Sequence, residues 1–182
     1  MSKTWITSDC HFGHTNIMKF CPETRGRFKD VDHMNETMIT EWNESVAPED
    51  IVYILGDFAF LPAQKAVAVL HRLNGSKILI EGNHDRKLLK DPAFRKCFTE
   101  VHKYHSFHYH QQMIVMFHYP IHYEWDQAHR GSVHFFGHVH GKKTGLEEYR
   151  ARDVGVDATG KVVTLFDEIL ADALTGILPN HH

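Results

Sequence analysis

The sequence predicts an α/β fold in which two stacked β-sheets are flanked by helices. Short apolar runs rich in β-branched or aromatic residues, each typical of a buried strand, are separated by segments with helical periodicity. The expected strands outnumber what one simple βαβ sheet requires, so a second sheet stacked on the first is the economical arrangement. With 182 residues, 42% of them hydrophobic, the chain suits a single domain over residues 1–182.

The N-terminal half alternates expected strands with two expected helices. Between Asp32 and Asn43, apolar side chains recur at i, i+4 and i+8 (Met34, Met38 and Trp42), which predicts one apolar helix face. A second helix is expected over residues 62–73, because a proline stands near its start and an Asn-Gly pair follows its end. The strands in this half are expected at Trp5-Ile6, Ile51 to Leu55 and Ile78 to Ile80.

The C-terminal half is expected to contain more strands than helices. Asp91-Pro92 opens a third helix, and a last helix is expected over Phe166 to Leu174. A closing hairpin is expected around Ala158-Thr159-Gly160, formed by Val154 to Val156 and Lys161 to Leu165. The other strands are expected at Val101 to Tyr109, Gln111 to Phe117 and Val133 to Phe136.

The composition limits the classes of protein to consider. A formal charge of −3 argues against the broad basic face of a general nucleic-acid binder, although it leaves room for a local basic patch. The three cysteines form no CxxC pair, which fits a reducing compartment. The sequence has neither a signal peptide nor a run of roughly 20 apolar residues that would span a bilayer. We therefore expect a cytoplasmic protein with no membrane partner.

Five polar motifs each follow an expected buried strand. Because ligands gather beyond the carboxyl ends of strands in open α/β sheets, we expect these motifs to converge on one site. Their imidazole, carboxylate and amide groups are the donors of a mixed nitrogen/oxygen metal centre. The motifs are Asp9-Cys10-His11, Gly56-Asp57, Gly82-Asn83-His84-Asp85, His118 and Gly137-His138-Val139-His140.

Spacing supports a metal site, although each motif alone is weak. In an extended segment, residues i and i+2 point the same way, so Asp9 and His11 could hold one cation. The Gly82–Asp85 segment is the most specific element. A turn in which Asn83 bonds its own backbone would account for that asparagine, but not for the histidine and aspartate that follow it.

In this order, the five motifs resemble the calcineurin-like metallophosphoesterase superfamily. The resemblance runs from Asp9 to His140, about three-quarters of the chain, and every metal-ligand position of the family pattern is filled. The stretch from Asp9 to Ile17 also resembles a compact bacterial and phage branch of that superfamily. The resemblance implies a four-layer α/β/β/α sandwich, with a binuclear metal centre at one edge of two stacked mixed sheets.

The resemblance also implies how the metal ligands are shared. Asp57 would bridge both ions, because a carboxylate offers two donor oxygens and a neutral imidazole cannot bridge. The donor set suits two divalent ions, with Mn expected first and Fe, Zn or Ni as alternatives. One metal would be held by Asp9, His11 and His140, and the other by Asn83, His118 and His138.

By the same resemblance, His84 is the general acid that protonates the leaving alkoxide. We expect Asp85 to orient its ring, and the alternative is a turn in which His84 merely bonds Asp85. Phosphate contacts are expected from His14, Asn16, Arg25 and Arg86. For the two arginines, a solvated surface charge is the competing interpretation.

These features predict a metal-dependent phosphoesterase, a hydrolase that attacks its substrate with hydroxide activated by a binuclear centre. We expect a phosphodiester or a small nucleotide-type substrate rather than a phosphoprotein, because no long insertion would build a protein-docking cap. A phosphomonoesterase is one alternative. A catalytically silent binding scaffold with the same fold is another. The sequence leaves the natural substrate and the oligomeric state open.

Overall fold

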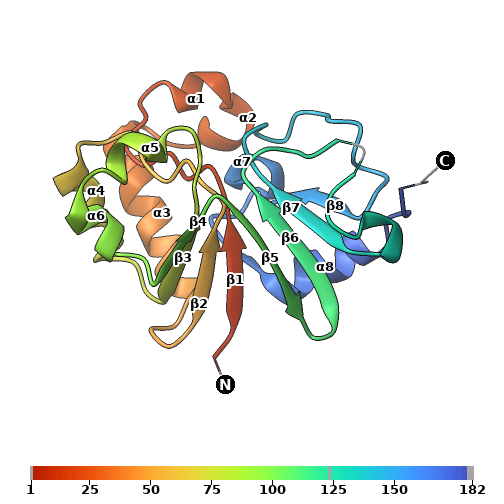
Figure 1. Ribbon diagram of the computed structural model, residues 1–182. Coiled ribbons are helices and arrows are strands. Elements are labelled where there is room, and N and C mark those ends of the chain that lie inside the picture. The colour runs from red at the N-terminus through yellow and green to blue at the C-terminus, as the bar shows by residue number, and fades with distance from the viewer. Residues whose placement is uncertain (1, 123, 180–182) are drawn as a thin grey trace.

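Two mixed β-sheets stack face to face in the computed structural model, which describes residues 2–122 and 124–179 (Figure 1). Helices complete a layered α/β sandwich, as the sequence predicted. His181 and His182, to which we assign no function, lie outside the described residues.

The first sheet has five strands in the order β4-β3-β2-β1-β9. Strands β1 to β4 run parallel, and β9 pairs antiparallel with β1 at one edge. Ile78, Leu79 and Ile80 of the central strand β3 are all buried, so both faces of that strand are covered, which explains why the sequence shows it as a continuous apolar run. The strands are β1 Thr4–Thr7, β2 Ile51–Ile54, β3 Ser76–Ile80, β4 Glu100–His102 and β9 Thr164–Leu165.

The second sheet has four strands in the order β5-β6-β7-β8. Strands β5 and β6 form an antiparallel hairpin, whereas β6, β7 and β8 run parallel. The carboxyl ends of β6 and β7 therefore lie at the same edge of this sheet, so the loops that follow the two strands can meet there. The strands are β5 Tyr104–Tyr109, β6 Gln112–Phe117, β7 Val133–Phe136 and β8 Ala151–Asp153.

Helices α3, α4 and α6 cover the outer face of the first sheet (Figure 1). The apolar face predicted for α3 is confirmed, since Met34, Met38 and Trp42 are fully buried. The helices are α1 Ile17–Phe20, α2 Pro22–Arg25, α3 Val31–Ser45, α4 Ala63–Leu70, α5 Asp85–Leu88, α6 Pro92–Lys96, the 3-10 helix η1 Ala128–Arg130, α7 Val156–Thr159 and α8 Phe166–Leu174.

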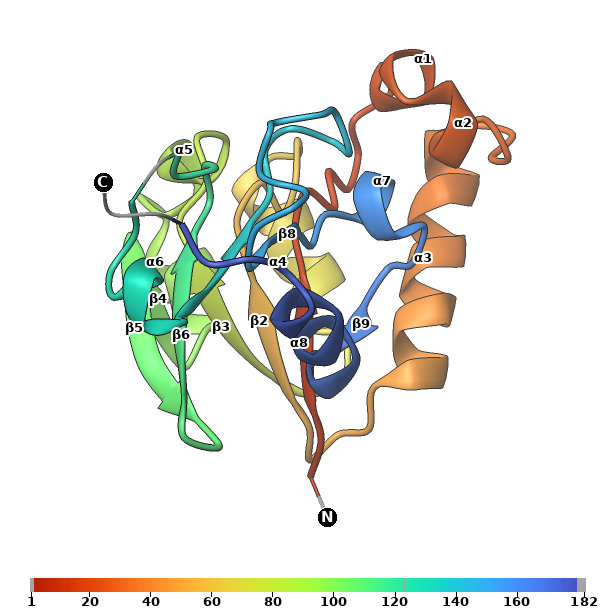
Figure 2. The same ribbon diagram turned by 90° about the vertical axis from the view of Figure 1, so that its right-hand side faces the viewer.

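A hydrophobic core fills the space between the two sheets. Strands β1 and β3 contribute Ile6 and Ile80, and the facing strands β6 and β7 contribute Met116 and Phe135. Helix α8 adds Phe166 to the same core and contacts strands of both sheets (Figure 2). The two sheets are thus held together by burial of a shared apolar surface.

The strand predicted over residues 101–109 is two strands in different sheets. Strand β4 ends at His102 and pairs with β3, whereas β5 begins at Tyr104 and pairs with β6. Lys103 lies between them and carries the chain from one sheet to the other. No glycine or proline marks this crossing, so the sequence pattern shows one uninterrupted strand.

The hairpin predicted near the C-terminus is wrong. Helix α7 occupies part of its first strand and its turn. It ends at Thr159 and is capped by Gly160, whose φ of 68° is left-handed. Strand β9 pairs with β1 instead of with residues 154–156. Gly155 forms an isolated bridge with Ser8, and the Val156 N–H donates to the Ser8 carbonyl, which ties this segment to the end of β1.

No helix in the described part of the chain is long and apolar enough to cross a membrane.

Candidate metal centre

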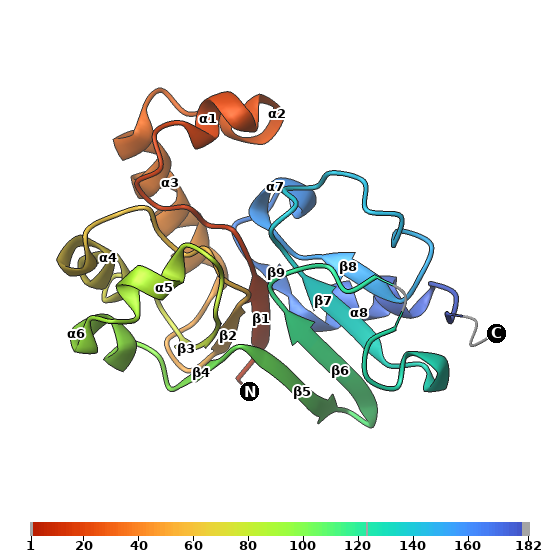
Figure 3. The same cartoon turned by 45° about the horizontal axis from the view of Figure 1, so that its top comes forward.

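Five loops converge at one edge of the two sheets, as the sequence predicted (Figure 3). Strands β1, β2 and β3 of the first sheet and β6 and β7 of the second end at this edge, and a polar motif follows each. Backbone bonds join the loops: the Asp9 N–H donates to the Gly56 carbonyl, and the Gly137 N–H to that of His118 (both 3.0 Å). The sheet topology therefore brings together side chains that are far apart in the sequence.

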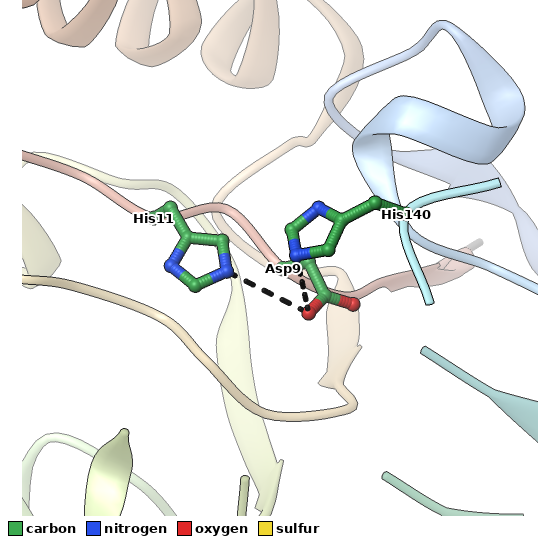
Figure 4. A group of neighbouring side chains, drawn as sticks. All are labelled: Asp9, His11 and His140. Atoms are coloured by element: carbon green, nitrogen blue, oxygen red, sulfur yellow. Dashed lines mark ion pairs between the residues drawn. The ribbon is translucent and has the colours of Figure 1, made fainter. Parts of the chain in front are cut away.

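The first group of donors comprises Asp9, His11 and His140 (Figure 4). Asp9 Oδ1 lies 3.7 Å from His11 Nε2 and 3.8 Å from His140 Nε2. The His11 and His140 rings stack with their centroids 5.1 Å apart. Two nitrogens and one oxygen that face one another at these distances can hold one cation.

The second group comprises Asp57, His118 and His138. Asp57 Oδ2 lies 3.5 Å from His118 Nε2 and 3.8 Å from His11 Nε2, so this oxygen faces both groups. Asn83 Oδ1 lies 3.2 Å from His118 Nε2, which places the amide oxygen beside the second group. The seven predicted ligands are thus brought to one place, with Asp57 between the two groups.

Unpartnered buried atoms test whether these residues fit a metal. Four buried side-chain nitrogen or oxygen atoms in the described part of the chain have no hydrogen-bond partner. Three of them, Asp9 Oδ1 and both ring nitrogens of His11, belong to the first group. Leaving a buried polar atom unpaired is costly, and a cation would satisfy Asp9 Oδ1 and one His11 nitrogen. The donors present therefore fit a metal ion.

The backbone is strained at most of the predicted ligands. Asp9, His11, Asp57, His138 and His140 all have left-handed φ angles, between 51° and 70°. Residues other than glycine rarely adopt this conformation. Such backbone strain is often found at functional sites, where the surrounding structure enforces it. Because each left-handed residue turns the chain sharply, the side chains point out of the extended path and toward the shared centre.

Two of the histidines are oriented by a second set of partners. His118 Nδ1 donates to the Leu55 carbonyl (2.7 Å), and His140 Nδ1 donates to the Asp157 carboxylate (2.8 Å). Each bond fixes the ring tautomer and leaves Nε2 free to bind a cation. Asp157 could not be predicted from the sequence, because it lies in the segment expected to form a hairpin and no motif marks this aspartate.

The second oxygen of Asp9 is held by its neighbours. Asp9 Oδ2 accepts hydrogen bonds from the Ser8 hydroxyl (2.7 Å) and from the His138 backbone N–H (2.8 Å). A Cβ atom at Gly137 would collide with both Ser8 Oγ and Asp9 Oδ2, so only glycine allows this close approach. This packing leaves Oδ1 as the carboxylate oxygen that faces the metal ligands.

Electrostatics keep both site carboxylates ionised. Burial alone would raise the pKa of Asp57, but the neighbouring His118, the backbone N–H of His84 and His11 lower it to about 2. Burial also opposes the charge on Asp9, yet His11, His118 and Ser8 hold its pKa below the usual range. An ionised carboxylate in each group favours the binding of divalent cations.

The fully buried position of Arg25 argues against the predicted phosphate contact. Its guanidinium is fully buried, pairs with Asp157 (Nε to Oδ1 2.7 Å) and donates to the Asp9 carbonyl (2.8 Å). The arginine thus supports the site from beneath, and neither the phosphate contact nor the solvated surface charge describes it. Because Asp157 also holds His140, one buried network connects α2, α7 and the first group of predicted ligands.

Asp85 does not orient the ring of His84. Its fully buried carboxylate accepts three backbone N–H groups, from Asp57 (2.8 Å), Phe58 (3.0 Å) and Gly82 (2.9 Å). Three donors use both oxygens, so Asp85 fixes the loops after β2 and β3 instead. The His84 ring lies with Nε2 3.8 Å from Asp57 Oδ2, on the exposed side of the site.

The remaining predicted phosphate contacts lie at different distances from the centre. The His14 ring centroid is 5.4 Å from that of His11, which places His14 at the rim of the site. Asn16 is exposed before α1. Arg86 is exposed, with Nε 3.5 Å from Glu81 Oε1.

Comparisons with known proteins support the fold and leave the chemistry open. No protein-family model matches the chain. A segment of 88 residues is 44% identical to an uncharacterized protein of Methanocaldococcus jannaschii, and covers 47% of this chain and 48% of that protein. The gene 66 protein of Mycobacterium phage L5 is 28% identical, over 93% of each chain. A solved structure from Aquifex aeolicus, of a protein of unknown function, has a TM-score of 0.70 and 26% identity, over 93% of this chain and 98% of that one.

Proposed function

We propose that this protein is a binuclear metal-dependent phosphoesterase similar to the calcineurin-like enzymes. One observation carries the proposal: two groups of donors flank Asp57 Oδ2, and the first retains buried oxygen and nitrogen atoms without partners. Asp9, His11 and His140 would hold one ion, and Asn83, His118 and His138 the other, with Asp57 shared. Mn²⁺ is the ion we expect first, and Fe, Zn or Ni would also suit these donors.

Two divalent ions at such a site activate a water molecule and bind phosphoryl oxygens. The chain's own contribution is to fix the donors before substrate arrives. The Leu55 carbonyl and Asp157 orient the imidazoles of His118 and His140, and Ser8 orients the Asp9 carboxylate. Preorganised groups do not have to rearrange as charge develops during the reaction, which lowers the barrier.

His84 supplies the proton for the leaving oxygen in this proposal. Its backbone N–H donates to Asp57 Oδ1 (2.9 Å), which holds the residue at the centre. Its side chain remains 39% exposed, so the ring can reach a substrate that approaches from solvent. A protonated Nε2 would donate to the departing alkoxide as the ester bond breaks.

The substrate we propose is a small phosphodiester or nucleotide-type ester. His84 and His138 are exposed, which leaves the centre accessible to a small ligand. The experiment compares hydrolysis of bis(p-nitrophenyl) phosphate and p-nitrophenyl phosphate by the Mn²⁺-loaded protein. A preference for the diester supports the proposal, and a preference for the monoester would make the protein a phosphomonoesterase. Absence of turnover with Mn²⁺, Fe²⁺, Zn²⁺ and Ni²⁺ would indicate a binding scaffold.

A further inference from the structure

A cleft of about 640 Å³ borders the candidate metal centre. One wall is the loop from β2 to α4, which contains Phe60, Leu61 and Pro62. The rest of the lining is Asn83, His84, Lys87 and Leu88, from the loop after β3 and from α5. We call it the Phe60 cleft. Because Asn83 and His84 line it, a group bound there lies next to the proposed metal ligand and the proposed acid.

Phe60 presents an exposed aromatic face to this cleft. Its side chain is 55% exposed, and its ring centroid lies 4.6 Å from that of His14 and 5.4 Å from that of His84. Phe20, which is 69% exposed, also neighbours His14, with the two ring centroids 6.1 Å apart. Single exposed apolar residues are common, but a row of four neighbouring rings that borders a catalytic site is a surface suited to stacking.

The loop that carries Phe60 is held firmly. The Phe60 N–H donates to the Phe12 carbonyl (2.8 Å), and the Phe12 N–H donates to the Phe58 carbonyl (3.0 Å). These bonds join the loop to the segment that carries Asp9 and His11. The aromatic face is therefore fixed relative to the metal ligands, as a binding platform must be.

The geometry points to a nucleobase as the occupant of the Phe60 cleft, carried by the nucleoside that leaves when the ester is cleaved. This inference rests on the proposed function and names its substrate class. A planar base can stack on the exposed part of the Phe60 ring, while its polar edge and the sugar meet Asn83, His84 and Lys87, the polar residues of the same lining. Most of the lining is apolar, but Asn83, His84 and Lys87 add hydrogen-bonding groups that a base and its sugar can use and an acyl chain cannot. The volume is that of a small-molecule site, and the net charge of −3 disfavours a long polyanion.

The position of the cleft beside His84 determines which nucleoside of the diester would bind there. His84 lines the cleft and would protonate the departing oxygen. A base in the cleft therefore belongs to the alcohol that departs, and the other half of the diester would extend away from Phe60.

Binding of adenosine tests the cleft without metal or phosphate. We expect the metal-free protein to bind adenosine saturably in an NMR titration. Phe60→Ala should weaken binding by about tenfold or more, since base–aromatic stacking has that strength. Phe60→Leu keeps apolar bulk without the aromatic face, so it should weaken binding if stacking is the cause. Tyr104→Ala removes an exposed aromatic ring on β5 and should bind as wild type does. Absence of binding, or equal binding by Phe60→Ala and wild type, would overturn the inference.

Kinetics test which nucleoside occupies the cleft. The substrates are a dinucleoside monophosphate and its analogue without a base on the leaving ribose, with Mn²⁺. We expect kcat/KM to favour the first by roughly tenfold to a hundredfold in wild type and in Tyr104→Ala, and nearly equal values in Phe60→Ala. A preference that depends only on the other base would overturn the assignment of the leaving nucleoside.

The two proposals fail in different ways. If bis(p-nitrophenyl) phosphate is hydrolysed but adenosine does not bind and no base preference exists, the cleft assignment is overturned and the phosphoesterase stands. If adenosine binds through Phe60 but no ester is hydrolysed with any metal, the base site stands and the phosphoesterase is overturned.

Discussion

Asp57 is the residue on which both halves of the site depend. We predict that Asp57→Asn lowers bound metal from about two ions to at most one per chain and nearly abolishes turnover, because a neutral amide bridges two cations poorly. The fold should survive, since Asn Oδ1 can still accept the His84 N–H that Asp57 Oδ1 accepts. Metal analysis and circular dichroism check both statements. The exposed Asp32→Asn is the control, and a fully loaded, fully active Asp57→Asn would refute the bridge.

His84 is predicted to act on the leaving group alone. His84→Ala should slow hydrolysis of alkyl esters by roughly 10²–10⁴-fold, the usual contribution of a general acid. Esters of p-nitrophenol should lose much less, because nitrophenolate departs without a proton. Metal content should not change, since His84 is outside the seven proposed ligands. An equal loss on both kinds of ester, with metal and fold intact, would rule out leaving-group protonation.

At single residues, the sequence pattern predicted the proposed ligands but not which charged side chains are buried. The seven ligand positions follow strand ends, so the local pattern was enough to place them together. Asp85 stands in one of these motifs and Arg25 lies on α2, but the partners of both are groups distant in the sequence: Asp157 for Arg25, and the backbone N–H groups of Asp57 and Phe58 for Asp85. From the sequence alone a charged side chain is expected to be exposed, and only the fold shows which buried group it pairs with.

A buried ion pair joins α2 to α7 beside the first group of donors, and we call this pair the clamp. Arg25 on α2 pairs with Asp157 on α7, and Asp157 also accepts from His140. We predict that Asp157→Asn destabilises the protein by about 3–5 kcal/mol, because it leaves a buried guanidinium without its counter-charge. Metal affinity should fall about 10–100-fold as His140 loses its orienting partner.

The control is an ion pair of the same kind on the surface. Glu41→Gln breaks the exposed Arg27–Glu41 pair and should cost only about 0–1 kcal/mol. Urea unfolding measures both variants, and Mn²⁺ titration measures affinity. Equal small losses in the two variants would show that the clamp does not support the fold.

At the opposite end of the first sheet, Asp50 joins β1 to the loop before β2. Its carboxylate accepts from the Lys3 N–H (2.8 Å), the Trp5 indole (2.8 Å) and the Ala47 N–H (3.0 Å). Burial opposes the charge, but these donors lower the pKa of Asp50. A carboxyl group whose folded pKa is depressed stabilises the fold above its unfolded pKa, and that stabilisation is lost as the pH falls through the folded pKa.

We therefore predict that Asp50→Asn is less stable than wild type at pH 7, by about 1.5–3 kcal/mol, the range for hydrogen bonds to a charged group. The difference should shrink as the pH is lowered below about 4, because the carboxyl of the unfolded wild-type chain is then protonated while that of the folded protein still resists protonation. Unfolding measured from pH 7 to pH 3 checks this. A difference that stays constant with pH would mean that the charge of Asp50 contributes nothing.

Elements with a strong apolar period were predicted well, and elements defined by long-range pairing were not. Helix α3 and the strands that precede the five motifs lie where the pattern placed them. The crossing at Lys103 and helix α7 were missed because each depends on a partner distant in the sequence: β3 and β6 for the crossing, and the end of β1 for α7. Such tertiary contacts override the local propensity for helix or strand.

Over the whole molecule, the proposed metal ligands come from both sheets. Asp9, Asp57 and Asn83 follow strands of the first sheet, whereas His118, His138 and His140 follow strands of the second. The His138 backbone N–H already bonds Asp9 across 129 positions of sequence. Bound metal would therefore tie the two sheets together at the edge opposite the N-terminus of β1 (Figure 1).

This arrangement predicts that metal removal destabilises the entire fold. A ligand that binds only the folded state at 100 times its Kd adds about 2.7 kcal/mol of stability. For a chain of this size that corresponds to a Tm change of roughly 5–10 °C. EDTA should lower Tm by this amount and stop turnover, and Mn²⁺ should restore both. Asp57→Asn serves as the comparison, since loss of the shared carboxylate should weaken metal binding in both groups and so make the shift much smaller. If verified metal-free wild type melts at the same temperature and hydrolyses esters at the same rate, the site does not bind structural or catalytic metal.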